Sequence, residues 1–142
     1  MKSKTHENII NAYRGEISGE LLYLFLSEKF IFEGNEKLGE IFKQLSKEEK
    51  GHANVLKQYI KEDVSQYDLS IEEIEKLKNH LNNPLQSLEL FAVGEKKAGE
   101  EIYPYFSQVA AQEGYEDIAK MFLTLAKVEL KHGKQLEEII GK

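Results

Sequence analysis

The stretch FKQLSKEEKGHANVL, residues 42–56, decides the fold of this chain, and the stretch FLTLAKVELKHGKQL, residues 122–136, repeats its pattern. In both stretches apolar residues recur at spacings of three and four, which places them on one stripe of an α-helix that faces a core. Each stretch also contains Glu-x-x-His, and residues three apart are neighbours on a helix surface. The sequence therefore predicts two core-facing helices that each carry a pair of potential metal ligands.

A further glutamate precedes each pair at nearly the same distance. Glu16 lies 33 residues before Glu49, and Glu95 lies 34 residues before Glu129. Both upstream glutamates directly follow a glycine. The chain thus offers six candidate metal ligands in two matched sets: Glu16, Glu49, His52, Glu95, Glu129 and His132.

The two halves of the chain form an internal repeat. Residues 15–60 align with residues 94–140, with one residue inserted in the second half. A helical hairpin that cannot bury its apolar stripe alone is expected to pack against its copy, here about a pseudo-twofold axis. The six ligands would then converge in the middle of a four-helix bundle.

Helix start and stop signals predict four long helices and a short helix in a crossover. Gly34 can take the left-handed conformation of a helix stop, and Asn35 can cap the next helix. Residues 70–73 have the form of a capping box, Pro84 suits the first turn of a helix, and Pro104 should kink a helix or release a carbonyl. We expect helices at residues 5–33, 35–61, 70–82, 84–114 and 115–140, and a loop at 63–68.

Composition agrees with one all-α domain covering residues 1–142. The chain has two prolines, long runs of helix-favouring residues and no cysteine, so it carries no disulfide, thiolate zinc site or rubredoxin-type centre. The net charge of −6 argues against a nucleic-acid partner. The sequence has neither a secretory signal nor an apolar run of membrane-spanning length, so we expect a cytoplasmic protein without a membrane partner.

Charge balance favours two metal ions in the proposed cluster. A carboxylate in an apolar interior costs roughly several kcal/mol even after relaxation, and neighbouring carboxylates repel one another. Two divalent cations balance four carboxylates. Glutamate oxygens with one imidazole per metal suit iron or manganese, so we expect two iron ions, with manganese or another divalent metal as the alternative.

This ligand set is that of the ferritin-like di-iron carboxylate bundles, and over nearly its whole length the chain resembles the di-iron domain of the rubrerythrins. The further matching motifs are Gly94-Glu95, Ile102-Tyr103-Pro104 and Glu113-Gly114. The resemblance implies an all-α, ferritin-like four-helix bundle of two hairpins, with a long crossover between the second and third long helices that contains a short helix. It also implies that the upstream glutamates are terminal ligands, that the glutamates of Glu-x-x-His bridge the metals, and that each histidine binds one metal.

Rubrerythrins place a tyrosine after each upstream glutamate, where it hydrogen-bonds the carboxylates. Tyr23 and Tyr103 occupy these positions, with plain aromatic packing as the alternative. Rubrerythrins also carry a second glutamate three residues after the third-helix ligand, but here that residue is Ala98. Glu20, on the same face as Glu16, could supply the missing carboxylate, although a partly exposed surface position is the other interpretation. Because the cysteine-rich rubredoxin segment is absent, electrons would come from a separate donor such as a rubredoxin.

The resemblance implies a redox enzyme that reduces hydrogen peroxide or dioxygen, as in oxidative-stress defence. A ferroxidase or iron-storage protein of the ferritin type is the alternative, and a metal-free helical interaction module is a third hypothesis. The stretch at residues 21–26, LLYLFL, is apolar all round, which indicates burial on two sides, by the bundle and by a second subunit. We therefore expect a homodimer.

Overall fold

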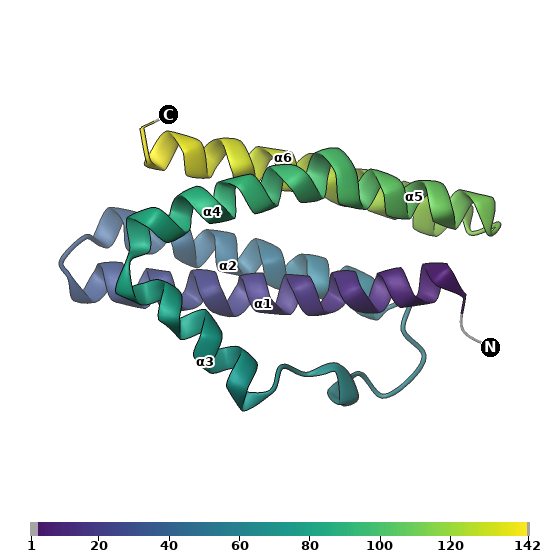
Figure 1. Ribbon diagram of the computed structural model, residues 1–142, viewed down its shortest axis with the longest axis horizontal. Coiled ribbons are helices and arrows are strands. Elements are labelled where there is room, and N and C mark those ends of the chain that lie inside the picture. The colour runs from purple at the N-terminus through teal and green to yellow at the C-terminus, as the bar shows by residue number, and fades with distance from the viewer. Residues whose placement is uncertain (1–2, 142) are drawn as a thin grey trace. The chain divides into compact units, whose positions relative to one another are not determined.

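The computed structural model describes residues 3–141, and every regular element in that range is a helix (Figure 1). This confirms the all-α prediction. None of these helices combines the length and apolar character needed to cross a bilayer. The elements are α1 (Lys4–Phe32), α2 (Glu36–Lys57), the 3-10 helix η1 (Val64–Tyr67), α3 (Ile71–Asn79), the 3-10 helix η2 (His80–Asn82), α4 (Pro84–Lys97), the π-helical turn η3 (Ala98–Ile102), α5 (Tyr103–Gln112) and α6 (Glu116–Ile139).

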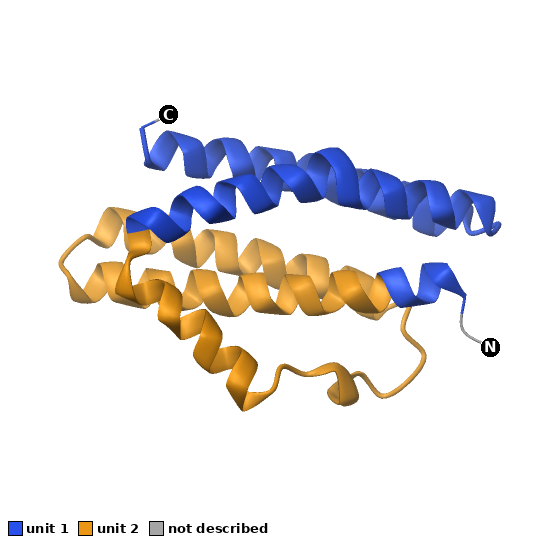
Figure 2. Ribbon diagram, viewed as in Figure 1, with its two compact units in different colours: residues 1–8, 85–142 blue, residues 9–84 orange. Residues whose placement is uncertain are grey.

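Internal contacts divide the chain into two compact units (Figure 2). Unit 1 comprises Met1–Asn8 and Leu85–Lys142, and unit 2 comprises Ile9–Pro84. In unit 2, α1 and α2 form one hairpin, and the crossover with α3 follows them. In unit 1, the helices from α4 to α5 form a second hairpin with α6. Each unit thus contains one copy of the repeated Glu-x-x-His pattern.

The turns at the tips of the two hairpins have the same geometry. Gly34 and Gly114 both have φ +87°, in the left-handed region where a side chain would be strained. The N–H of Asn35 donates to the carbonyl of Phe30 at 2.8 Å, and Tyr115 repeats this bond to Ala110 at 2.8 Å. The helix stop predicted at Gly34 is therefore confirmed.

A buried serine links the helices of each hairpin in the same way. The hydroxyl of Ser27 donates to the carbonyl of Gly39 at 2.6 Å, and the hydroxyl of Ser107 donates to the carbonyl of Ala119 at 2.8 Å. The second pair lies 80 residues after the first. The internal repeat predicted from the sequence is therefore present in the hydrogen bonding of the two units.

Helix α2 ends earlier than predicted, at Lys57 rather than near Lys61. Beyond it, the N–H groups of Gln58, Tyr59 and Ile60 donate to carbonyls three residues back, at 3.3, 3.0 and 3.0 Å. The last turn has therefore tightened to 3-10 geometry, a common way for a helix end to satisfy its last carbonyls. Helical periodicity continues through such a turn, which explains the overestimate.

The third long helix, predicted at residues 84–114 with an irregularity at Pro104, contains the π turn η3. There the N–H of Tyr103 donates to the carbonyl of Ala98, five residues back. Pro104 follows directly and has no N–H to donate, so the irregularity predicted for this proline takes the form of a π turn beside it. A π turn holds one more residue than the α-helix around it. This is the residue that the sequence alignment showed as an insertion in the second half.

Arg14 of α1 holds the crossover by hydrogen bonds. Arg14 donates to the carbonyl of Tyr67 at 3.1 Å and to both carboxylate oxygens of Glu73, at 2.7 and 2.9 Å. The predicted capping box of Ser70 and Glu73 is confirmed. Lys78 of α3 also lies over the ring of Phe25, 5.8 Å from its centroid. Phe25 belongs to the apolar stretch at residues 21–26, whose second side the sequence suggested a second subunit would bury. Helix α3 covers this side chain.

Candidate metal centre

Three of the predicted ligands come together within unit 2. Glu16 projects from α1, and Glu49 and His52 project from α2. Each offers a ligand atom, and these atoms all lie within 4.8 Å of one another. The Nδ1 of His52 is 3.5 Å from the Oε2 of Glu16. Both glutamates are buried, whereas the histidine side chain is 13% exposed. We call these three residues the unit 2 triad.

Unit 1 contains the matching set. Glu95 projects from α4, and Glu129 and His132 project from α6. Their ligand atoms also lie within 4.8 Å of one another. The Nδ1 of His132 is 3.7 Å from the Oε2 of Glu95 and 3.7 Å from the Oε2 of Glu129. Here the histidine is fully buried, and the glutamate of α4 is the partly exposed member, at 11%. We call these residues the unit 1 triad.

The apolar stripes predicted from the sequence position both triads. Large side chains of each stripe are completely buried above and below the ligands, Phe42 and Leu56 on α2, and Phe122 and Leu136 on α6. Helical spacing then turns the intervening Glu-x-x-His toward the same interior. The carboxylates of Glu49 and Glu129 are consequently buried.

The donor set fits an iron or manganese ion in each unit. Two carboxylates and one imidazole are ligands that either metal accepts, and no cysteine is available to favour zinc. With a neutral histidine, each triad carries two negative charges in an apolar interior. A divalent cation would balance them, whereas two buried carboxylates without a cation repel one another.

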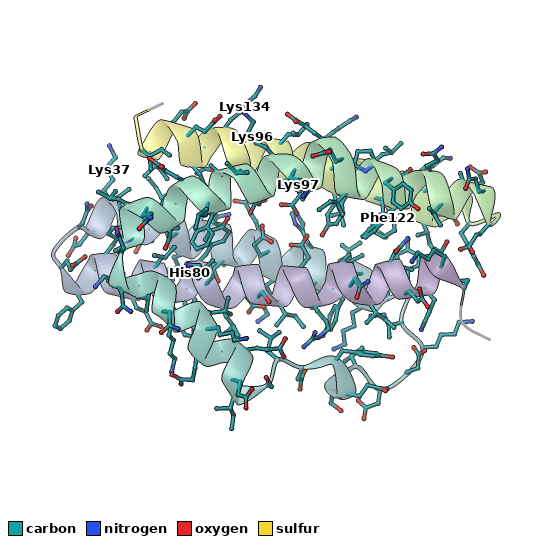
Figure 3. The ribbon with its side chains drawn as sticks, in the orientation of Figure 1. Lys37, His80, Lys96, Lys97, Phe122 and Lys134 are labelled. Carbon is teal, nitrogen blue, oxygen red and sulfur yellow. The ribbon has the colours of Figure 1, made fainter. Side chains whose placement is uncertain are left out.

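Both tyrosines singled out from the sequence are buried in equivalent aromatic contacts. The rings of Tyr23 and Phe42 are 5.9 Å apart, and those of Tyr103 and Phe122, which is labelled in Figure 3, are 5.6 Å apart. The spacing from glutamate to tyrosine is seven residues in unit 2 and eight in unit 1. The π turn absorbs the extra residue, so each tyrosine keeps its contact with the equivalent phenylalanine.

Glu20, considered as a seventh ligand, belongs to neither group of potential ligands found among residues 3–141. Its negative charge instead contributes to a raised pKa of Tyr13. Burial is the largest cause of that shift, followed by the charges of Asp68 and Glu20. Ala98 is half-buried at the start of the π turn.

Sequence reasoning missed one residue beside the ligands, Gly19. Its Cα faces the carboxylate of Glu49 so closely that a Cβ built there would lie 2.9 Å from Oε2. The available signal was a glycine inside a predicted helix, which costs about 1 kcal/mol relative to alanine and so suggests a packing reason.

Comparison of the sequence with known proteins identifies relatives of this chain. A sequence model of the rubrerythrin family matches residues 7–140. Rubrerythrin from Nitratidesulfovibrio vulgaris is 29% identical over 137 residues, which cover 94% of this chain and 67% of that protein. Rubrerythrin from Porphyromonas gingivalis is 26% identical over 133 residues, which cover 94% of this chain and 64% of that protein. The chain thus spans about two thirds of the length of these curated relatives.

A solved structure shows the fold. Symerythrin from Cyanophora paradoxa, reduced with dithionite, matches with a TM-score of 0.81 at 23% identity, over 99% of this chain and 85% of that one. At this identity the likeness concerns the fold alone. It shows that the chain has the all-α, ferritin-like fold predicted from the sequence.

Proposed function

Because the chain belongs to the rubrerythrin family, we propose that its two triads together hold two iron ions and that the protein reduces hydrogen peroxide or dioxygen. The observation that carries this proposal is the duplicated triad, with the same three residue types, the same helical spacing and His-to-upstream-Glu distances of 3.5 and 3.7 Å. Four carboxylates and two divalent ions form a neutral set, which supports two ions rather than one.

In this proposal, bound ferrous ions supply the two electrons that, with two protons, convert one hydrogen peroxide to two waters. As the family resemblance implies, the upstream glutamates would be terminal ligands, Glu49 and Glu129 would be bridging ligands, and each histidine would bind one ion. Tyr23 and Tyr103 are proposed to steady the carboxylates by hydrogen bonds. Reducing electrons are proposed to come from a separate donor such as a rubredoxin.

Rapid mixing tests the proposed oxidant. Protein loaded anaerobically with two ferrous ions is mixed with hydrogen peroxide in one experiment and with dioxygen in another, and oxidation is followed by absorbance. We expect peroxide to oxidise the centre at least about ten times faster, a difference of about 1.4 kcal/mol in activation free energy. Equal rates, or a faster reaction with dioxygen, would contradict hydrogen peroxide as the preferred oxidant and leave dioxygen as the proposed one.

One observation favours a second function, in which the protein oxidises or stores iron. Ala98 stands where rubrerythrins carry a further carboxylate, which leaves the simpler six-ligand set of the ferritins. Storage predicts a large hollow shell and uptake of iron well beyond two ions per chain. The redox proposal instead predicts a cytoplasmic homodimer, for which exposed Leu90 and Val93 on α4 offer apolar surface. Sedimentation velocity with iron-uptake measurements distinguishes the two functions.

A further inference from the structure

Gly19 leaves space that the carboxylate of Glu49 fills. A Cβ built on Gly19 would lie 2.9 Å from Oε2 of Glu49, 3.3 Å from Cδ and 3.4 Å from Cγ, and these are its three nearest atoms. All three belong to one side chain. The contact lies within unit 2, between the middle of α1 and the middle of α2.

Gly15, one helical turn earlier, shows that the contact is specific to Gly19. Both glycines lie inside α1, but a Cβ on Gly15 would have no neighbour within 4 Å. Alanine at Gly15 would therefore gain helix propensity at no steric cost. Alanine at Gly19 would gain the same propensity while displacing the Glu49 carboxylate.

The second half of the repeat does not reproduce this contact. Glu16 corresponds to Glu95, so the residue three positions on, Gly19, corresponds to Ala98, where a methyl group is present. The neighbouring Gly99 meets the carbonyl oxygen of Ala126 and the side chain of Leu130 instead of a ligand. Among the described glycines, only Gly19 lies this close to a triad carboxylate.

We propose that Gly19 is a positioning residue: its missing side chain fixes where the Glu49 carboxylate lies and so sets the affinity of the unit 2 triad for its metal. The inference rests on the proposed function of that triad. In the metal-free protein, the end of the Glu49 side chain can rotate away from an added methyl group at little cost. Once a metal holds the carboxylate, that movement is blocked, and the clash weakens metal binding.

The test compares the Gly19→Ala and Gly15→Ala variants of the whole chain with the unsubstituted protein. Anaerobic ferrous titration followed by calorimetry gives the affinity, and thermal unfolding of the metal-free proteins gives the stability. We expect Gly19→Ala to lose about 10- to 100-fold in affinity for one of the two ions, the range typical of residues that orient metal ligands. We expect Gly15→Ala to bind like the unsubstituted protein, and neither variant to lose stability in the metal-free state.

Each alternative result has a defined meaning. If the unsubstituted protein binds ferrous iron and Gly19→Ala binds it as tightly as Gly15→Ala, the positioning role is wrong and the proposed function stands. If the unsubstituted protein binds no ferrous iron, the proposed function and the inference both fail. If Gly19→Ala alone does not fold, adding Glu49→Ala to it decides: recovery of folding shows that the added methyl group meets Glu49, and failure to recover overturns the inference.

Discussion

At the scale of single residues, the two triads make matched predictions. Replacing Glu49 or His132 by alanine removes one ligand from unit 2 or from unit 1. Removing a residue that only orients a metal ligand typically weakens metal binding roughly 10- to 100-fold. We expect each of these substitutions, which removes a ligand itself, to weaken binding of one ferrous ion by at least that much. Elemental analysis and anaerobic ferrous titration measure this. His80→Ala is the control, because His80 lies in the crossover (Figure 3) and belongs to neither triad. Full binding after both triad substitutions would contradict the assignment.

The sequence could predict which six residues form the two triads but not the contact at Gly19. Ligand residues are recognisable because Glu and His recur at helical spacing inside an apolar stripe. Gly19 has no side chain, and its importance depends on the path of α2 opposite it. The structure also separates Glu20 from the triads, which its position in the sequence could not do. Its helical spacing from Glu16 allowed a common face, but its charge acts on Tyr13 and Glu20 joins neither triad.

At the scale of elements, the first turn of α1 depends on a distant carboxylate. Glu113, just after α5, accepts hydrogen bonds from the N–H of Lys4 at 3.3 Å, from the N–H of Thr5 at 2.7 Å and from the Thr5 hydroxyl. All three residues belong to unit 1. The carboxylate thus satisfies backbone donors that a helix start leaves without intrahelical partners, and its charge favours that end of the helix. The hydrogen bonds from Thr5 and Lys4 hold the pKa of Glu113 below its usual value of 4.5.

This pKa shift gives the pH dependence a definite sign. A carboxylate whose pKa is lower in the folded state stabilises the protein fully above the unfolded pKa, and the stabilisation is lost as the pH falls through the folded pKa. We expect Glu113→Gln to lower the melting temperature at pH 7, with the difference from the unsubstituted protein shrinking below pH 4.5. Thermal unfolding across pH 3 to 7 measures it. Glu40→Gln, at an exposed position of α2, should show no such trend.

The π turn η3 is an element whose position the sequence predicted but whose geometry it did not. The alignment of the two halves predicted one extra residue in the second, and Pro104 predicted an irregularity nearby. Neither specified a π turn, because a bulge, a kink and a wider turn all accommodate an extra residue beside a proline. The structure resolves the choice through the bond from Tyr103 to Ala98, which keeps the ring of Tyr103 against Phe122.

At the scale of the whole molecule, the fold class, the helix order and the internal repeat were predictable because they depend on periodicity and helix-end signals. We propose that the two units form one ferritin-like domain, in which metal binding compensates for burying four carboxylates. A ligand that binds only the folded state raises its stability by RT ln(1 + [L]/Kd), about 2.7 kcal/mol at a concentration of 100 Kd.

That linkage distinguishes a metal centre from a metal-free interaction module. For a chain of this length, about 2.7 kcal/mol corresponds to a rise of roughly 5 to 10 °C in melting temperature. We expect this rise when ferrous iron is added anaerobically at 100 times its Kd, and its reversal on removal of the metal by a chelator, because the ion balances carboxylates that otherwise repel one another in the interior. The Glu49→Ala/His132→Ala double variant should lose most of the effect while retaining its helical circular dichroism. An unchanged melting temperature for the unsubstituted protein would instead favour the interaction module, in which the glutamates form a polar layer without metal.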